Sequence, residues 1–87
     1  MTLLEEAQNI IEGQRKNDYG SAQESFGRIA TIWSAILGVP VSPKQVALCM
    51  VGMKCARLAA TIDHRDSWVD VIGYAALVDQ LESTEQL

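Results

Sequence analysis

The sequence predicts an all-α fold, a single domain of four helices, and two observations support it. No run of residues alternates apolar and polar side chains with the period of two that marks a strand, whereas four segments show helical spacing. Each segment also has recognisable start and stop residues. Eighty-seven residues suffice for one hydrophobic core. We therefore expect one domain over residues 1–87, with helices at about 2–17, 21–37, 43–61 and 67–82.

The first two helices each begin at a hydroxyl residue that is followed three positions later by Glu. Thr2 precedes Glu5, and Ser21 precedes Glu24, which is the spacing of a capping box. Gly38 follows the second helix, and glycine is the residue most often found just beyond a helix end. These residues predict where both helices start and where the second one stops.

The third helix has the best-specified start, because Ser42 can cap it, Pro43 suits its first position and Gln45 completes a capping box. Its first half is apolar almost all round, which predicts a central, buried helix. The fourth helix is expected to follow a short turn in which the side chain of His64 is solvated.

The composition limits the class of protein. The net charge of −4 and the pI near 4.7 argue against binding to a long nucleic-acid backbone, although a small anionic ligand needs only a few local cations. A chain this short that is 48% hydrophobic is expected to bury apolar surface between subunits, so we predict a homo-oligomer.

The sequence also predicts a cytoplasmic protein. The N-terminus lacks the basic region of a signal peptide, and the longest apolar run, at residues 46–53, is far shorter than the roughly 20 residues that cross a bilayer. Cys49 and Cys55 are six positions apart in one predicted helix, hence on different faces, which disfavours a disulfide or a metal pair. They suit a reducing compartment.

Cations interrupt the third helix at Lys54 and Arg57, and buried cations need partners. If the third and fourth helices are antiparallel about a turn near His64, two polar stripes should face each other. We call them the polar seam, in which Arg57 is expected opposite Asp70, Thr61 opposite Asp66, and Lys54 near Tyr74. The seam is either an interhelical salt-bridge network that fixes the register or part of a ligand site.

In the ligand interpretation, Lys54 and Arg57 bind phosphate oxygens, and Tyr74 reaches the ligand. Asp66 and Asp70 could hold Mg²⁺, although two carboxylates one turn apart are a weak metal signal without further oxygen ligands. No other cofactor is predicted.

A second wall of the pocket is predicted at the start of the second helix. A helix N-terminus behind Gly20 is suited to anions, with Ser21 at the cap. Tyr19 could stack on a base while Lys16 contacts a phosphate. Arg28 is a further ligand-binding candidate, although as a single residue it equally fits a solvated helix charge.

The stretch from Asp66 to Leu77, DSWVDVIGYAAL, resembles the last helix of the all-α nucleotide pyrophosphohydrolases of the MazG-like group. That resemblance implies a helical bundle whose four carboxylates hold Mg²⁺ against a nucleoside triphosphate. This sequence differs from that pattern, because Ser67 replaces a Glu and Lys54 and Arg57 stand where the hydrolases carry two more. Exchanging carboxylates for cations favours direct binding of an anion.

A second resemblance covers residues 15–81 and is carried by three motifs: Asp18-Tyr19-Gly20, Phe26-x-x-Ile29-Ala30-x-x-Trp33, and Lys54-x-x-Arg57 with Asp66-x-x-x-Asp70-x-x-Gly73-Tyr74. These are similar to small proteins common in bacteriophage genomes, often labelled MazG-like. The resemblance implies a phage-encoded protein.

The leading functional hypothesis is a phage protein that binds a nucleotide or nucleotide-derived signal between helices or subunits, and that sequesters a second messenger of host immunity. The first alternative is a Mg²⁺-dependent pyrophosphohydrolase in which Asp66 and Asp70, with Glu24 or Glu12, hold the metal. The second alternative is a structural or partner-binding helical module without a ligand.

Overall fold

The computed structural model describes residues 1–13 and 21–81, and within those ranges every regular element is helical. The elements are α1 (Leu3–Glu12), α3 (Ala22–Leu37), α4 (Pro43–Ala60), α5 (Arg65–Leu77) and a short 3-10 helix, η1 (Val78–Gln80). The predicted all-α fold of four helices is therefore confirmed for the described part of the chain.

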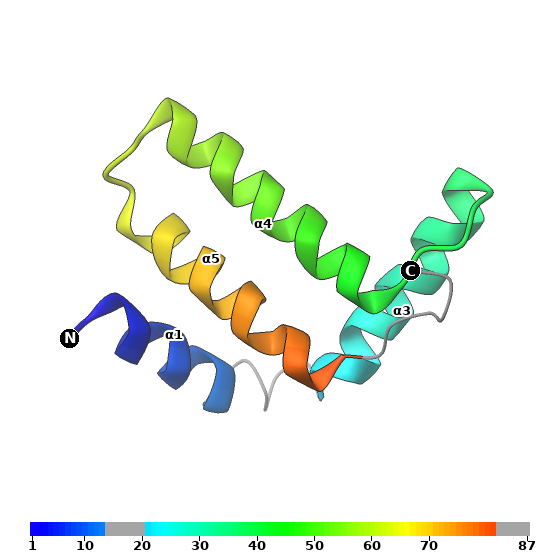
Figure 1. Ribbon diagram of the computed structural model, residues 1–87, viewed down its shortest axis with the longest axis horizontal. Helices are drawn as coiled ribbons and strands as arrows, with labels where there is room; N and C mark the ends of the chain where they lie inside the picture. The colour runs from blue at the N-terminus through cyan, green and yellow to red at the C-terminus, as the bar shows by residue number, and fades with distance from the viewer. Residues whose placement is uncertain (14–20, 82–87) are drawn as a thin grey trace.

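Three of the helices form one layer. Figure 1 shows α5 in the middle, with α4 antiparallel to it on one side and α1 on the other, while α3 crosses near the start of α4 and the end of α5. The molecule measures 39 × 30 × 21 Å along its principal axes. Many residues of the two outer helices, α1 and α4, are exposed to solvent.

The predicted helix starts at Thr2 and Ser42 are confirmed as complete capping boxes. The Ser42 hydroxyl accepts from the backbone N–H of Gln45 at 3.2 Å, and the Gln45 side chain accepts from the backbone N–H of Ser42 at 2.9 Å. Ser21 caps α3 by accepting from the N–H of Glu24, but its own hydroxyl donates to the Glu24 carboxylate.

The link from α3 to α4 is fixed by backbone geometry and by one serine. Gly38 adopts the left-handed conformation (φ 72°), which ends α3 as predicted, and its N–H donates to the Ser34 carbonyl. The Ser34 hydroxyl donates to the Ala30 carbonyl at 2.7 Å and accepts from the N–H of Val41 at 2.8 Å. These bonds set the direction in which the chain enters α4.

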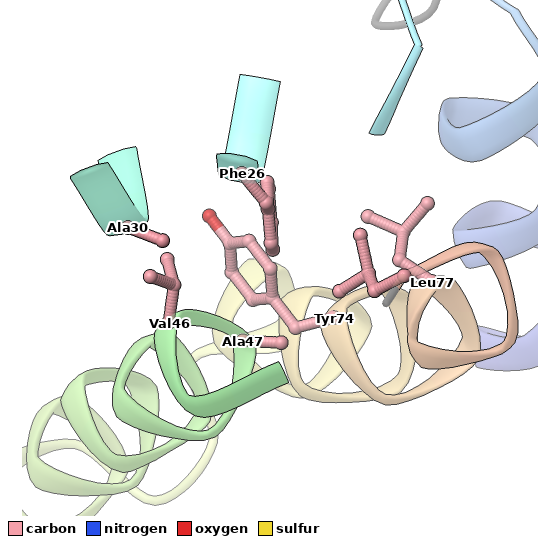
Figure 2. Close-up of a cluster of buried hydrophobic side chains, with 7 residues drawn as sticks. Phe26, Ala30, Val46, Ala47, Tyr74 and Leu77 are labelled. Atoms are coloured by element: carbon pink, nitrogen blue, oxygen red, sulfur yellow. The ribbon is translucent and has the colours of Figure 1, made fainter. Parts of the chain in front are cut away.

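The hydrophobic core lies where α3 crosses the α4–α5 pair. Figure 2 shows Phe26 and Tyr74 facing each other beside Val46, with ring centroids 6.1 Å apart. Trp33 is half-buried and packs against the same cluster. The buried side chains of the cluster are Phe26, Ala30, Val46, Ala47, Tyr74, Leu77 and Leu81.

Three predicted helix bounds were wrong. α1 ends at Glu12 because Gly13 follows as its cap, not near residue 17. α5 begins at Arg65 rather than near residue 67, because the capping residue is His64 and not Asp66 or Ser67. Its regular part ends at Leu77, and η1 carries the chain to Leu81 in place of a helix to residue 82.

The prediction that the third helix is central and buried was also wrong for the single chain. α4 lies at the edge of the layer in Figure 1, with Val46, Ala47 and Leu58 buried and a long apolar side exposed. The apolar pattern that predicted burial is real, but the other helices of this chain cover only one side of it.

Candidate functional site

The polar seam forms between α4 and α5, but with a register one helical turn away from the predicted one. Lys54 Nζ lies 3.1 Å from Asp70 Oδ2, and both side chains are about one-third exposed, at 28% and 32%. Arg57, which was expected opposite Asp70, instead hydrogen-bonds His64. The register differs because α5 begins at Arg65, which shortens the turn that joins the helices.

Arg57 belongs to a polar cluster at the closed end of the hairpin. Its Nη2 lies 3.3 Å from His64 Nε2, and His64 Nδ1 lies 2.8 Å from the hydroxyl of Ser67. Ser67 is 1% exposed, whereas Arg57 is exposed and His64 is half-buried. His64 is therefore held by two partners and not solvated as predicted.

The two nitrogens of the His64 ring have competing partners. A neutral imidazole has a single acceptor nitrogen, and a guanidinium can only donate, so the Arg57 bond requires Nε2 to accept. The side-chain cap of α5 instead requires Nδ1 to accept from the backbone N–H of Ser67, 3.3 Å away. The tautomer decides between the two: when Nε2 accepts, Nδ1 donates to the Ser67 hydroxyl, and the Ser67 N–H keeps its bond to the His64 carbonyl at 3.1 Å.

Two further contacts that sequence reasoning missed hold this end of the hairpin. The indole N–H of Trp68 donates to the Ile62 carbonyl at 2.7 Å and ties α5 to the turn. The Arg65 guanidinium pairs with the Glu6 carboxylate and thereby joins α5 to α1. The second contact leaves no local pattern in the sequence, since it links residues that are 59 positions apart.

The remaining seam residues do not converge on Lys54 and Arg57. Asp66 is exposed in the first turn of α5, where a negative charge is favourable for the helix dipole. Thr61 caps the end of α4 through its backbone N–H, which donates to the Arg57 carbonyl. Tyr74 is 8% exposed, and its ring is part of the core.

An open groove lies between α1 and α5, beside the Lys54–Asp70 pair. Its roughly 240 Å³ of empty space includes open solvent, so the enclosed volume is far below the roughly 300–1,000 Å³ of pockets that enclose small molecules. Its lining is mostly apolar: Ala7, Ile10, Ile11, Val69, Asp70, Gly73, Tyr74 and Leu77. The groove alone is therefore too small to enclose a nucleotide.

The second predicted wall is described only in part. Lys16, Tyr19 and Gly20 lie outside the described residues. Ser21 caps α3, and Arg28 is exposed on the same helix with no ion pair to another described residue.

The acidic residues of the described ranges do not gather into a metal centre. Within residues 1–13 and 21–81, no group of three or more His, Cys, Asp or Glu side chains is arranged to hold a metal ion. Asp66 and Asp70 consequently have no third protein ligand of these types among the described residues, and Mg²⁺ binding there stays a prediction.

Comparison with known proteins finds phage relatives. The chain is 42% identical over 86 residues to the "Gene 55 protein" of Mycobacterium phage L5, covering 98% of this chain and 55% of that protein. It is also 42% identical over 80 residues to the "Gene 55 protein" of Mycobacterium phage D29, covering 92% and 53%. The chain thus spans about half the length of these curated relatives. The predicted likeness to phage proteins is confirmed, whereas the MazG-like resemblance stays a hypothesis.

Three further findings concern solved structures, membrane-spanning helices and the protein family. No solved structure matches this chain significantly. Among the described helices, none combines the length and the apolar character that crossing a membrane requires. Residues 2–82 match the family described as "Domain of unknown function (DUF6378)". Because that match covers nearly the whole chain, the protein belongs to the DUF6378 family.

Proposed function

We propose that this protein binds a small anionic nucleotide, with Arg57 as the main phosphate contact. The observation that carries the proposal is the state of Arg57, which is exposed and donates to an imidazole instead of a carboxylate. No ion pair neutralises it within the described part of the chain. A guanidinium positioned by one hydrogen bond keeps further donors for a planar anionic group.

The rest of the seam has a different part in the proposal. Lys54 is already paired with Asp70, so it supplies phosphate contacts only if that ion pair opens. Because the groove beside the pair is small, the ligand is expected to be shared with a second subunit or with residues 16–20. Exposed Arg28 is a further candidate contact.

The proposed role is binding without hydrolysis. The described residues gather no set of carboxylates that resembles a metal cage. The phage relatives support a phage setting, in which holding a nucleotide signal of the host without consuming it would be useful.

The test is a panel of nucleoside mono-, di- and triphosphates and cyclic dinucleotides, screened by melting shift and then by calorimetry. Arg57→Gln should weaken the binding of any positive ligand at least about tenfold, the loss of one charge-assisted contact. Lys44→Gln is the matched control, because it removes the same charge from the same helix and should leave affinity unchanged.

Two outcomes would replace the proposal with one of the alternatives. Steady release of pyrophosphate from a triphosphate in the presence of Mg²⁺ would establish a hydrolase. The absence of any melting shift or heat across the panel would favour a structural or partner-binding module.

A further inference from the structure

The side of α4 that faces away from α5 is apolar over most of its length. Seven exposed residues lie on it at helical spacing, and we call them the outer face of α4: Leu48, Cys49, Gly52, Met53, Ala56, Ala59 and Ala60. None of them is charged. Buried Ala47 and Leu58 lie on the opposite side of the helix.

No part of the described chain covers this face. Figure 1 shows α4 as the outermost helix of the layer, with no other helix alongside residues 48–60 on that side. Leu48 is 69% exposed and Met53 is 57% exposed. A helix that is apolar all round is normally buried, and a contiguous exposed apolar patch marks an interaction site.

Gly52 adds a separate observation. It lies in the interior of α4 with an ordinary helical conformation, where glycine costs roughly 0.5–1 kcal/mol relative to alanine. A Cβ atom at this position would meet nothing within 4 Å, so the packing of this chain does not require glycine there. Glycine would be required at this position if the backbone of another chain packed closely against the helix.

The shape and charge of the face suit a second copy of this chain. Small residues at Gly52 and Ala56 lie beside the larger Leu48 and Met53, so the same face carries both projections and recesses. A two-fold pairing places the same patch on both subunits, and this patch can complement itself. Because the face is uncharged, the net charge of −4 does not bring like charges together at its centre.

We propose that the outer face of α4 is a homodimer interface, in which two α4 helices pack closely across a two-fold axis at Gly52 and Ala56. This inference does not depend on nucleotide binding. It explains why a helix whose sequence is typical of a central position lies at the edge of the single chain.

The first test uses the two native cysteines of the full chain, both exposed in the single chain. Cys49 lies within the outer face and Cys55 beside it. Alkylation followed by peptide mass spectrometry should label Cys49 more slowly than Cys55, since Cys49 lies within the face and Cys55 lies at its edge. Dilution should remove the difference. Equal labelling rates at all concentrations would overturn the proposal.

The second test measures mass in solution by sedimentation across a concentration series. The wild type should reach twice the 9.5 kDa of the chain. Ala56→Lys should return it to the monomer mass, because two cations would meet at the axis, while Ala75→Lys on the exposed side of α5 should not. A monomeric wild type, or an Ala56→Lys variant that keeps the wild-type mass, would contradict the interface.

If Ala56→Lys unfolds, the wild type supplies the decisive measurement. A dimer melts at a temperature that rises with protein concentration, whereas the melting of a monomer is independent of concentration. Gly52→Leu refines the result, since a leucine meets open space in the single chain but blocks close approach of two helices. It should weaken association although it adds apolar surface; unchanged association would exclude close packing at Gly52.

Discussion

The two halves of the α4–α5 hairpin are held together by different interactions. In the half nearer residue 43, α3 crosses the pair and Phe26 packs on Tyr74 in an apolar core. In the half nearer the turn, polar contacts join the helices through the Lys54–Asp70 pair and the Arg57–His64 bond. We call them the apolar half and the polar half.

The apolar half is expected to supply most of the stability of this pair of helices, whereas the polar half carries the candidate ligand contacts. Burial of large apolar side chains is the main source of folding free energy, and the apolar half holds most of them. Ion pairs that are about one-third exposed contribute little to the free energy of folding, so the Lys54–Asp70 pair can open at small cost. The cations proposed to bind a ligand lie in the half where folding depends on them least.

The largest expected effect is on the apolar half. Phe26→Ala removes a side chain that is 2% exposed and should lower the free energy of unfolding by about 3–5 kcal/mol, measured by urea denaturation. Ile36→Ala is the matched control on the same helix, because Ile36 is 74% exposed, and it should change stability by less than about 0.5 kcal/mol. Equal losses in the two variants would show that the core lies elsewhere.

A smaller effect is expected at the start of α4. Ser42→Ala removes a complete, buried capping box and should cost about 1–2 kcal/mol of stability. Ser21→Ala removes the cap of α3, whose second hydrogen bond goes to a side chain instead of the backbone, and should cost less. A larger loss of stability in Ser21→Ala than in Ser42→Ala would mean that α3, and not α4, has the more strongly capped start.

The polar half should respond weakly. A double-mutant cycle with Lys54→Met and Asp70→Asn is expected to give a coupling free energy below about 1 kcal/mol, because both side chains are about one-third exposed. The coupling should fall further as salt is added. A coupling above about 2 kcal/mol would mean that this pair is a structural element comparable to the core.

The smallest effect concerns pH and the first helix, outside both halves. Hydrogen bonds from the Thr2 backbone, and next from its side chain, hold the pKa of the Glu5 carboxyl below its ordinary value. A lowered pKa in the folded state stabilises α1 at pH values above the ordinary Glu pKa, and the contribution is lost as the pH falls through the lowered one.

Thr2→Val should therefore raise the pKa of Glu5, followed by NMR titration of its carboxyl carbon. Thr31→Val, the same exchange on α3, is the control and should leave the titration of Glu5 unchanged. An unaltered Glu5 midpoint in Thr2→Val would show that the hydroxyl does not contribute.

Much of the fold could be predicted from the sequence because helix ends carry local signals. Thr2, Ser42 and Gly38 are fixed by hydrogen bonds to residues three or four positions away, so a short window of sequence contains both partners. The register of the hairpin was wrong by one turn, since it depends on His64 as the capping residue of α5, and histidine is not a strong capping signal.

The candidate site was less predictable because it depends on contacts between distant segments. The Arg65–Glu6 pair and the burial of Tyr74 against Phe26 are set by how α1 and α3 pack on the hairpin. The apolar pattern of α4 predicted a central, buried helix, whereas the structure places α4 at the edge of the layer with one side exposed. A single sequence does not state which surfaces cover a helix.

The contacts of the two tryptophans give each half its own optical signal. Trp33 packs against the core beside the apolar half, whereas Trp68 is 40% exposed and donates to the turn at Ile62. Emission from Trp33 should accordingly lie at shorter wavelength than emission from Trp68. Two single-tryptophan proteins, Trp33→Phe and Trp68→Phe, would therefore report separately on each half, and a ligand that binds at Arg57 should change the fluorescence of Trp68 first.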